Sequence, residues 1–114
     1  MAKKAAVVGT TGPKPVPKTW RVTVLADQAA ADPGLLTEHG LSLWLEGPAG
    51  CLIFDTGQGV AFAENAARLG IDLGRASALV LSHGHYDHGG GLAQARKAAP
   101  HSQVWALPGA ARDR

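Results

Sequence analysis

The stretch from Leu79 to Gly91, LVLSHGHYDHGGG, decides the interpretation of this sequence. It opens with three consecutive apolar residues, a pattern typical of a strand that is buried on both faces of a sheet. Three histidines and one aspartate follow within six residues, and a run of glycines then leads into a helical pattern from Leu92 to Ala99. The pattern predicts a strand, a polar loop and a helix, with the polar side chains at the carboxyl end of the strand.

Four side chains in this loop, His83, His85, Asp87 and His88, have the types and the spacing of metal ligands. Side chains at positions i and i+2 at the end of a strand project to the same side, so His83 and His85 can converge on one ion. A tight turn after His85 would swing Asp87 and His88 toward a second ion, and paired metals are a recurring arrangement for hydrolysis. Imidazole and carboxylate are ordinary zinc ligands, although the same set suits iron and manganese. We therefore expect two divalent metal ions, with zinc as the first choice.

The rest of the chain alternates between strand patterns and helix patterns. Alternating β-branched residues predict a strand over 20–25, and a hairpin over 41–54 turns at Gly47–Gly50. A helix is expected over 60–69, and a last strand over 103–107. Strands and helices in this mixed order predict an α/β (α+β mixed) fold in which helices cover a sheet.

Composition and charge exclude several classes of protein. The chain has 114 residues, of which 46% are hydrophobic and 18% charged, the balance of an ordinary globular domain. The excess of 11 Lys and Arg over 9 Asp and Glu gives a net charge of only +2, too little for a broad nucleic-acid-binding face. No apolar stretch is long enough to span a membrane. Cys51 is the single cysteine, which excludes an internal disulfide framework and favours a reducing compartment. We expect a cytoplasmic protein that binds neither nucleic acid nor a membrane.

Two regions of the chain differ in composition. Residues 1–19 hold alternating prolines and lysines and are expected to form an extended arm, whereas residues 20–114 are expected to form the domain. Three tryptophans, Trp20, Trp44 and Trp105, fall on expected strands, and we expect them in the hydrophobic core.

The string HGHYDH, residues 83–88, resembles the signature of the metallo-β-lactamase-fold hydrolases. The strand that closes in FDTG, residues 54–57, is similar to the other amino-terminal hallmark of that superfamily. Within it, TEHGLSLWLE (37–46) together with both motifs looks most like the branch of dihydropterin-type synthases and related hydrolases. The resemblance covers about residues 20–112 and implies the amino-terminal half of a metallo-β-lactamase αββα sandwich.

The resemblance also implies roles for individual residues. His83 and His85 would ligate the first metal, and Asp87 and His88 the second. Asp55 would lie beneath the site and hold the histidine loop by hydrogen bonds, because an oriented imidazole binds metal better than a free one. Metal-bound water in such sites yields hydroxide near neutral pH, which would attack an ester or phosphoester bond of a small-molecule substrate. Asp87 would be catalytic by orienting that hydroxide.

Glu38 and His39 are the candidates for substrate binding. They precede an expected strand, and the resembling branch has Glu-His-Gly at this place, close to the mouth of the site. The alternative is a polar loop without a function of its own.

The resemblance implies further ligands from a later half of the fold. After His88, only His101 and Asp113 remain as additional candidates, so truncation of a longer coding sequence is the simplest explanation of the length. A half-sandwich exposes one apolar sheet face, and we expect it to self-associate or to pair with a chain that carries the complementing carboxyl-terminal half. The expected function is a zinc-dependent hydrolase when completed. The alternatives are a pterin-forming synthase of the same fold, an inactive metal-binding remnant, and an interaction module with incidental histidines, so the sequence leaves open whether this chain is itself an enzyme.

Overall fold

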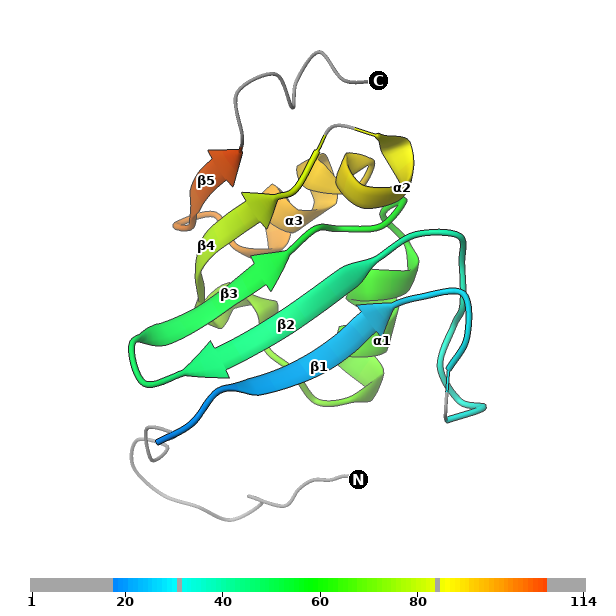
Figure 1. Ribbon diagram of the computed structural model, residues 1–114, viewed down its shortest axis with the longest axis horizontal. Coiled ribbons are helices and arrows are strands. Elements are labelled where there is room, and N and C mark those ends of the chain that lie inside the picture. The colour runs from blue at the N-terminus through cyan, green and yellow to red at the C-terminus, as the bar shows by residue number, and fades with distance from the viewer. Residues whose placement is uncertain (1–17, 31, 84, 107–114) are drawn as a thin grey trace.

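The computed structural model of the chain describes residues 18–30, 32–83 and 85–106 (Figure 1). The extended arm expected over residues 1–19 lies almost wholly outside these ranges. Among the helices of the described ranges, none has the length and apolar character needed to cross a membrane.

Five strands form one mixed sheet in the order β1-β2-β3-β4-β5 (Figure 1). Their bounds are β1 Arg21–Ala26, β2 Ser42–Gly47, β3 Gly50–Phe54, β4 Ala76–Leu81 and β5 Gln103–Ala106. The first three strands are antiparallel neighbours, whereas β3, β4 and β5 run parallel. The sequence predicted a strand at each of these places. It placed the start of β4 at Leu79 rather than Ala76, because the small residues before Leu79 give a weak strand signal.

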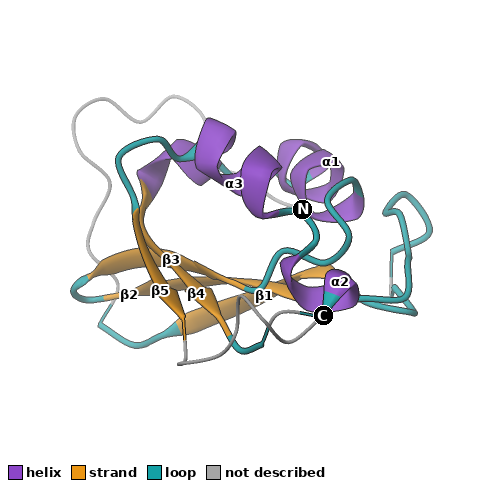
Figure 2. Cartoon of the chain, turned by 90° about the horizontal axis from the view of Figure 1, so that it is seen from above, coloured by secondary structure: helices purple, strands orange, loops and turns teal. Residues whose placement is uncertain are grey.

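Two helices, α1 (Ala61–Arg68) and α3 (Leu92–Ala98), cover one face of the sheet (Figure 2). A 3-10 turn, η1 (Leu73–Arg75), precedes β4, and a short helix, α2 (Tyr86–Gly89), follows it. Helices α1 and α3 lie where the sequence predicted helices, whereas α2 lies within the expected polar loop. The mixed α/β architecture predicted from the sequence is confirmed.

The core lies between the sheet and its helices. Trp44, Ile53 and Leu79 are neighbours across β2, β3 and β4, and all three are fully buried. Phe62 of α1 is buried in the same cluster. Each side chain of this size stabilises the fold by about 1.5–3 kcal/mol when it is removed from water. Burial of this layer therefore stabilises the packing of the helices on the sheet.

The opposite face of the sheet is also apolar, and no helix of the described residues covers it (Figure 2). The side chains that alternate with the core positions point to this open face, and all but the last are apolar: Val22, Val24, Leu43, Leu45, Leu52, Phe54, Ala78, Val80, Trp105 and Gln103. The sequence predicted that β4 is buried on both faces. Within the described ranges β4 has cover on one side, where Leu79 and Leu81 are buried, and Val80 lies on the open face.

Only one of the three tryptophans expected in the core lies there. Trp44 is fully buried, whereas Trp20 and Trp105 are 53% and 59% exposed. Trp105 alternates with Val104, which packs against the core, so the indole of Trp105 belongs to the open face. Trp20 precedes β1 and its indole lies over Gly47, where a Cβ would come within 2.5 Å of the ring. The prediction was wrong for these two residues because strand alternation does not reveal which face the helices cover.

The parallel pairing of β3 with β4 brings two chain segments to one edge of the sheet. Phe54 is the register partner of Val80, and the backbone N–H of Asp55 donates to the carbonyl of Val80 at 2.8 Å. Asp55 directly follows β3 and Ser82 directly follows β4, so both lie at the carboxyl ends of neighbouring strands. This edge carries the histidine motif.

Candidate metal centre

Three of the four ligands expected from the sequence lie together at the end of β4. One ligand atom from each of His83, His85 and Asp87 falls within 4.8 Å of the other two. A tetrahedral zinc ion holds its ligand atoms roughly 3.4 Å apart, so small side-chain shifts bring this group to bonding distance. Two imidazoles and a carboxylate are a donor set that suits zinc and other divalent ions. These residues therefore fit a metal ion.

The fourth expected ligand, His88, lies beside both Asp87 and His83. Its Nε2 is 3.8 Å from Oδ2 of Asp87, and its ring centroid is 4.2 Å from that of His83. The sequence grouped Asp87 with His88 alone. In the structure the Asp87 carboxylate lies near His88 as well as near the two earlier histidines, so it can serve either ion of a pair.

Asp55 lies behind the cluster and is fully buried. Its Oδ2 is 2.7 Å from Nδ1 of His88, and its Oδ1 accepts from the backbone N–H of Ser82 at 2.8 Å. An ionised carboxylate only accepts hydrogen bonds, so the proton of this pair belongs on Nδ1 of His88. The lone pair of His88 Nε2 is then left for a metal, the arrangement in which a carboxylate orients a metal-binding imidazole.

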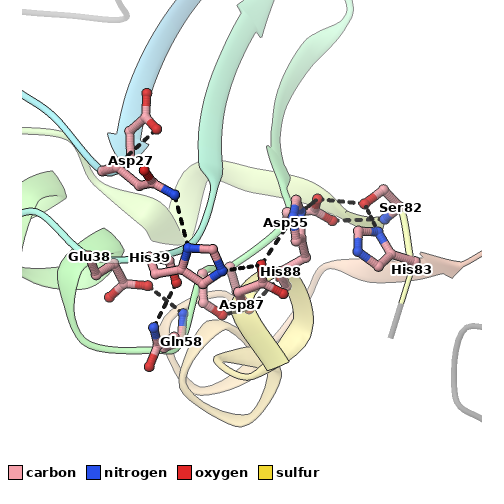
Figure 3. A network of polar contacts seen from close by, with 12 residues as sticks. Asp27, Glu38, His39, Asp55, Gln58, Ser82, His83, Asp87 and His88 are labelled. Carbon is pink, nitrogen blue, oxygen red and sulfur yellow. Dashed lines mark hydrogen bonds and ion pairs between the residues drawn. The ribbon is translucent and has the colours of Figure 1, made fainter. Parts of the chain in front are cut away.

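Ser82 extends the same support to His83 (Figure 3). Its hydroxyl donates to Oδ2 of Asp55 at 2.6 Å and lies 2.8 Å from Nδ1 of His83. The hydroxyl has one proton, which it gives to Asp55, so it accepts from Nδ1 of His83 and leaves Nε2 for a metal. Ser82 was not among the site residues predicted from the sequence. Its position between the predicted strand and the first histidine could have indicated that its hydroxyl lies near that histidine.

Glu38 lies against the start of α1 rather than in open solvent. Its carboxylate accepts from the backbone N–H of Gln58 at 2.6 Å and of Ala61 at 3.3 Å. The N-cap residue of α1, Val60, provides no side-chain cap. Glu38 therefore satisfies backbone donors that a helix start leaves unpaired, and its negative charge suits the helix dipole. Its role in substrate binding stays a prediction.

His39 contacts one of the candidate ligands (Figure 3). Its Nε2 is 3.2 Å from Oδ2 of Asp87, and its Nδ1 is 2.9 Å from Nε2 of Gln28. The Tyr86 ring lies nearby, with its centroid 6.4 Å from that of His39, and is exposed. The structure thus brings His39 to the candidate ligand Asp87, and substrate contact by His39 stays a prediction.

The model of one protein family, the metallo-beta-lactamase superfamily, matches residues 36–111. The chain belongs to the metallo-beta-lactamase superfamily. The matched range includes both motifs on which the sequence resemblance rested, FDTG at 54–57 and HGHYDH at 83–88. The superfamily predicted from the sequence is confirmed.

Solved structures of three metallo-beta-lactamases are similar to this superfamily member. Rm3 metallo-beta-lactamase is 30% identical, over 68% of this chain and 29% of its own, with a TM-score of 0.57. An enzyme with a HARLDQ motif from Cronobacter sakazakii is 25% identical, over 67% of this chain and 28% of its own, with a TM-score of 0.57. MEM-A1, a subclass B3 enzyme from a soil metagenome library, is 18% identical over 86% and 33%, with a TM-score of 0.59, a likeness of fold alone. A search among curated proteins finds no match.

This chain thus spans 28–33% of the length of these three metallo-beta-lactamases. Of the two additional ligands considered from the sequence, Asp113 lies outside the described residues. His101 precedes β5, which runs parallel to β4, whereas the histidine motif follows β4. His101 is exposed and lies toward the opposite end of the strands, so the structure does not bring it to the cluster.

Proposed function

We propose that this chain is the metal-binding, amino-terminal part of a metal-dependent hydrolase. His83, His85, Asp87 and His88 would hold two divalent metal ions, with zinc as the first choice. The observation that carries the proposal is the common orientation of the imidazoles. Asp55 and Ser82 engage Nδ1 of His88 and His83, which leaves Nε2 of both rings available beside the Asp87 carboxylate.

Divalent ions in such a site would polarise the bond under attack and lower the pKa of a bound water toward neutrality. The residues of this chain supply the rest of the chemistry. Asp55 and Ser82 keep two imidazoles in the metal-binding tautomer. Asp87 presents a carboxylate beside them, which can accept a hydrogen bond from an attacking water and orient it.

The proposed substrate is a small molecule with an ester, phosphoester or cyclic amide bond. The sequence resemblance favours the first two classes, and the names of the similar structures add the β-lactam amide. A panel with one substrate of each class, together with a pterin substrate, separates hydrolysis from the pterin-forming alternative. Bound metal without turnover of any of them would favour a metal-binding module without catalysis.

The experiment that tests the proposal is elemental analysis of the purified chain. We expect about one or two equivalents of zinc, lost in the double variant His83→Ala/His85→Ala. The exposed His101→Ala is the matched control and should retain the metal. A wild-type chain without metal after zinc loading, or a double variant that keeps its metal, would overturn the proposal.

A further inference from the structure

We propose that His39 is a positioning residue for Asp87, holding one carboxylate oxygen so that the other is directed to the metal. This inference rests on the proposed metal site. It concerns a residue outside the histidine motif, separated from Asp87 by nearly half of the chain.

The contact itself is the first evidence. Nε2 of His39 lies 3.2 Å from Oδ2 of Asp87, within the range of a charge-assisted hydrogen bond. The side chain of Asp87 is only 19% exposed, whereas that of His39 is 60% exposed. The imidazole therefore stands on the solvent side of the carboxylate and limits its rotation.

Gln28 fixes the direction in which His39 donates. The amide Nε2 of Gln28 lies 2.9 Å from Nδ1 of His39, and an amide nitrogen can only donate. Nδ1 therefore accepts, and the proton of the neutral ring is on Nε2, which points to Asp87. The result is a chain of hydrogen bonds from Gln28 through His39 to Asp87. Figure 3 shows the link between His39 and Asp87.

The backbone around His39 is docked onto α2 and onto the loop after β3. The carbonyl of His39 accepts from Nε2 of Gln58 at 2.7 Å, and the N–H of Leu41 donates to the carbonyl of Asp87 at 3.0 Å. Between them, a Cβ on Gly40 would come within 2.6 Å of that same carbonyl. Only glycine allows this close approach without a shift of the backbone.

These contacts give each residue of the Glu-His-Gly segment a separate task. Glu38 holds the start of α1, His39 holds the carboxylate of Asp87, and Gly40 lets the two segments meet. The chemical consequence is that Oδ2 of Asp87 is held by His39, which leaves Oδ1 for the metal. Partners that orient a ligand in this way are worth about 10–100-fold in metal affinity.

The test is a competition titration of the metal-free chain with Zn²⁺ against a chelator. His39→Phe removes the donor but keeps a ring of similar size, and it should weaken zinc binding about 10–100-fold. His39→Gln can place an amide N–H near the position of Nε2, and it should restore affinity to within about threefold of wild type. His101→Phe is the matched control and should bind as wild type does.

A second readout does not depend on metal. Imidazole ¹⁵N NMR of the metal-free chain should report the Nε2–H tautomer for His39, and the unfolding midpoint of metal-free His39→Phe should match that of wild type. Zinc affinity of His39→Phe equal to wild type, equal losses in the Phe and Gln variants, or an Nδ1–H tautomer would overturn the inference. If the wild-type chain bound no zinc, the proposed function would fail. The NMR measurement of the His39 tautomer would still show whether Nε2 of His39 donates to Asp87.

Discussion

The buried carboxylate of Asp55 lies 2.7 Å from Nδ1 of His88, although the two residues are 33 positions apart in the sequence. Asp55 has a positive φ of 57°, a conformation that residues other than glycine adopt rarely and aspartate more readily than most. The turn after β3 therefore aims this carboxylate at the end of β4, where Ser82 also donates to it. One acid thus determines the orientation of two candidate ligands.

Replacement of Asp55 by asparagine tests that relationship with little change of volume. The amide nitrogen of Asp55→Asn can face His88 only if Nδ1 of His88 accepts, which moves the ring proton to Nε2 and blocks metal binding there. We expect zinc affinity to fall about 10–100-fold, measured by competition titration with a chelator.

The control for this prediction is Ser82→Ala, which removes the link to His83 but leaves the Asp55–His88 contact intact. Its loss of zinc affinity should be smaller than that of Asp55→Asn. Equal zinc affinity in Asp55→Asn and wild type would show that Asp55 does not orient His88.

Glu38 should contribute to stability independently of any metal. Glu38→Ala removes the acceptor for the backbone N–H groups of Gln58 and Ala61, and should lower the free energy of unfolding by about 1–3 kcal/mol. Glu64→Ala is the matched control, because this exposed glutamate of α1 forms a surface ion pair with Arg68, and such pairs contribute little to stability. Urea unfolding of the metal-free proteins measures both. Equal stability of the two variants would contradict a capping role for Glu38.

Asn65 of α1 ties the loop before Glu38 to the helix. Its buried side chain donates to the carbonyls of Leu25 and Leu36 at 2.8 and 2.9 Å, and accepts from the N–H of Leu36 at 2.8 Å. Asn65→Leu leaves these backbone groups without partners and should cost about 3 kcal/mol. Native-state hydrogen exchange should show lost protection of the Leu36 amide.

The graded control is Asn65→Asp, which keeps the acceptor for Leu36 but lacks both donors. The Leu36 amide should stay protected in this variant even though the free energy of unfolding falls. Retained protection of Leu36 in Asn65→Leu would show that the loop is held by other contacts.

The sequence was sufficient for the strands and for the grouping of the candidate ligands His83, His85 and Asp87, because both depend on local patterns. Alternation marks a strand, and ligands at i and i+2 of a strand end must share a side. The short helix α2 was not predicted. Its turn forms as the N–H groups of His88 and Gly89 donate to the carbonyl of His85, inside a glycine-rich segment whose composition indicates a loop.

The supporting contacts of the site could not be predicted, because they join residues that are distant in sequence. Gln28 reaches His39 across 11 residues, and Gln58 reaches the Glu38 carboxylate across 20. Each contact depends on how the loop before β2 packs against α1 and α2. The pattern of side chains within one segment does not predict how that segment packs against another. The Glu-His-Gly segment was therefore recognised as polar and near the site, but the separate tasks of its residues came only from the structure.

The open face of the sheet predicts that this chain associates with a second copy of itself. The side chains that point to this face from the five strands are apolar except for Gln103, and none is charged, so two copies can meet there without repulsion. Val24→Glu adds a charge to the face at a position that is already 46% exposed, so the fold should tolerate it. We expect size-exclusion chromatography with light scattering to show a concentration-dependent dimer for wild type and a monomer for Val24→Glu.

The matched control is Val60→Glu, which places the same charge on a valine that is 68% exposed and precedes α1 on the helix side of the sheet. Because Val60 lies away from the open face, this variant should associate as wild type does. A general effect of added negative charge would instead shift both variants equally toward the monomer. A wild-type chain that stays monomeric at every concentration, or equal behaviour of the two variants, would exclude association through the open face.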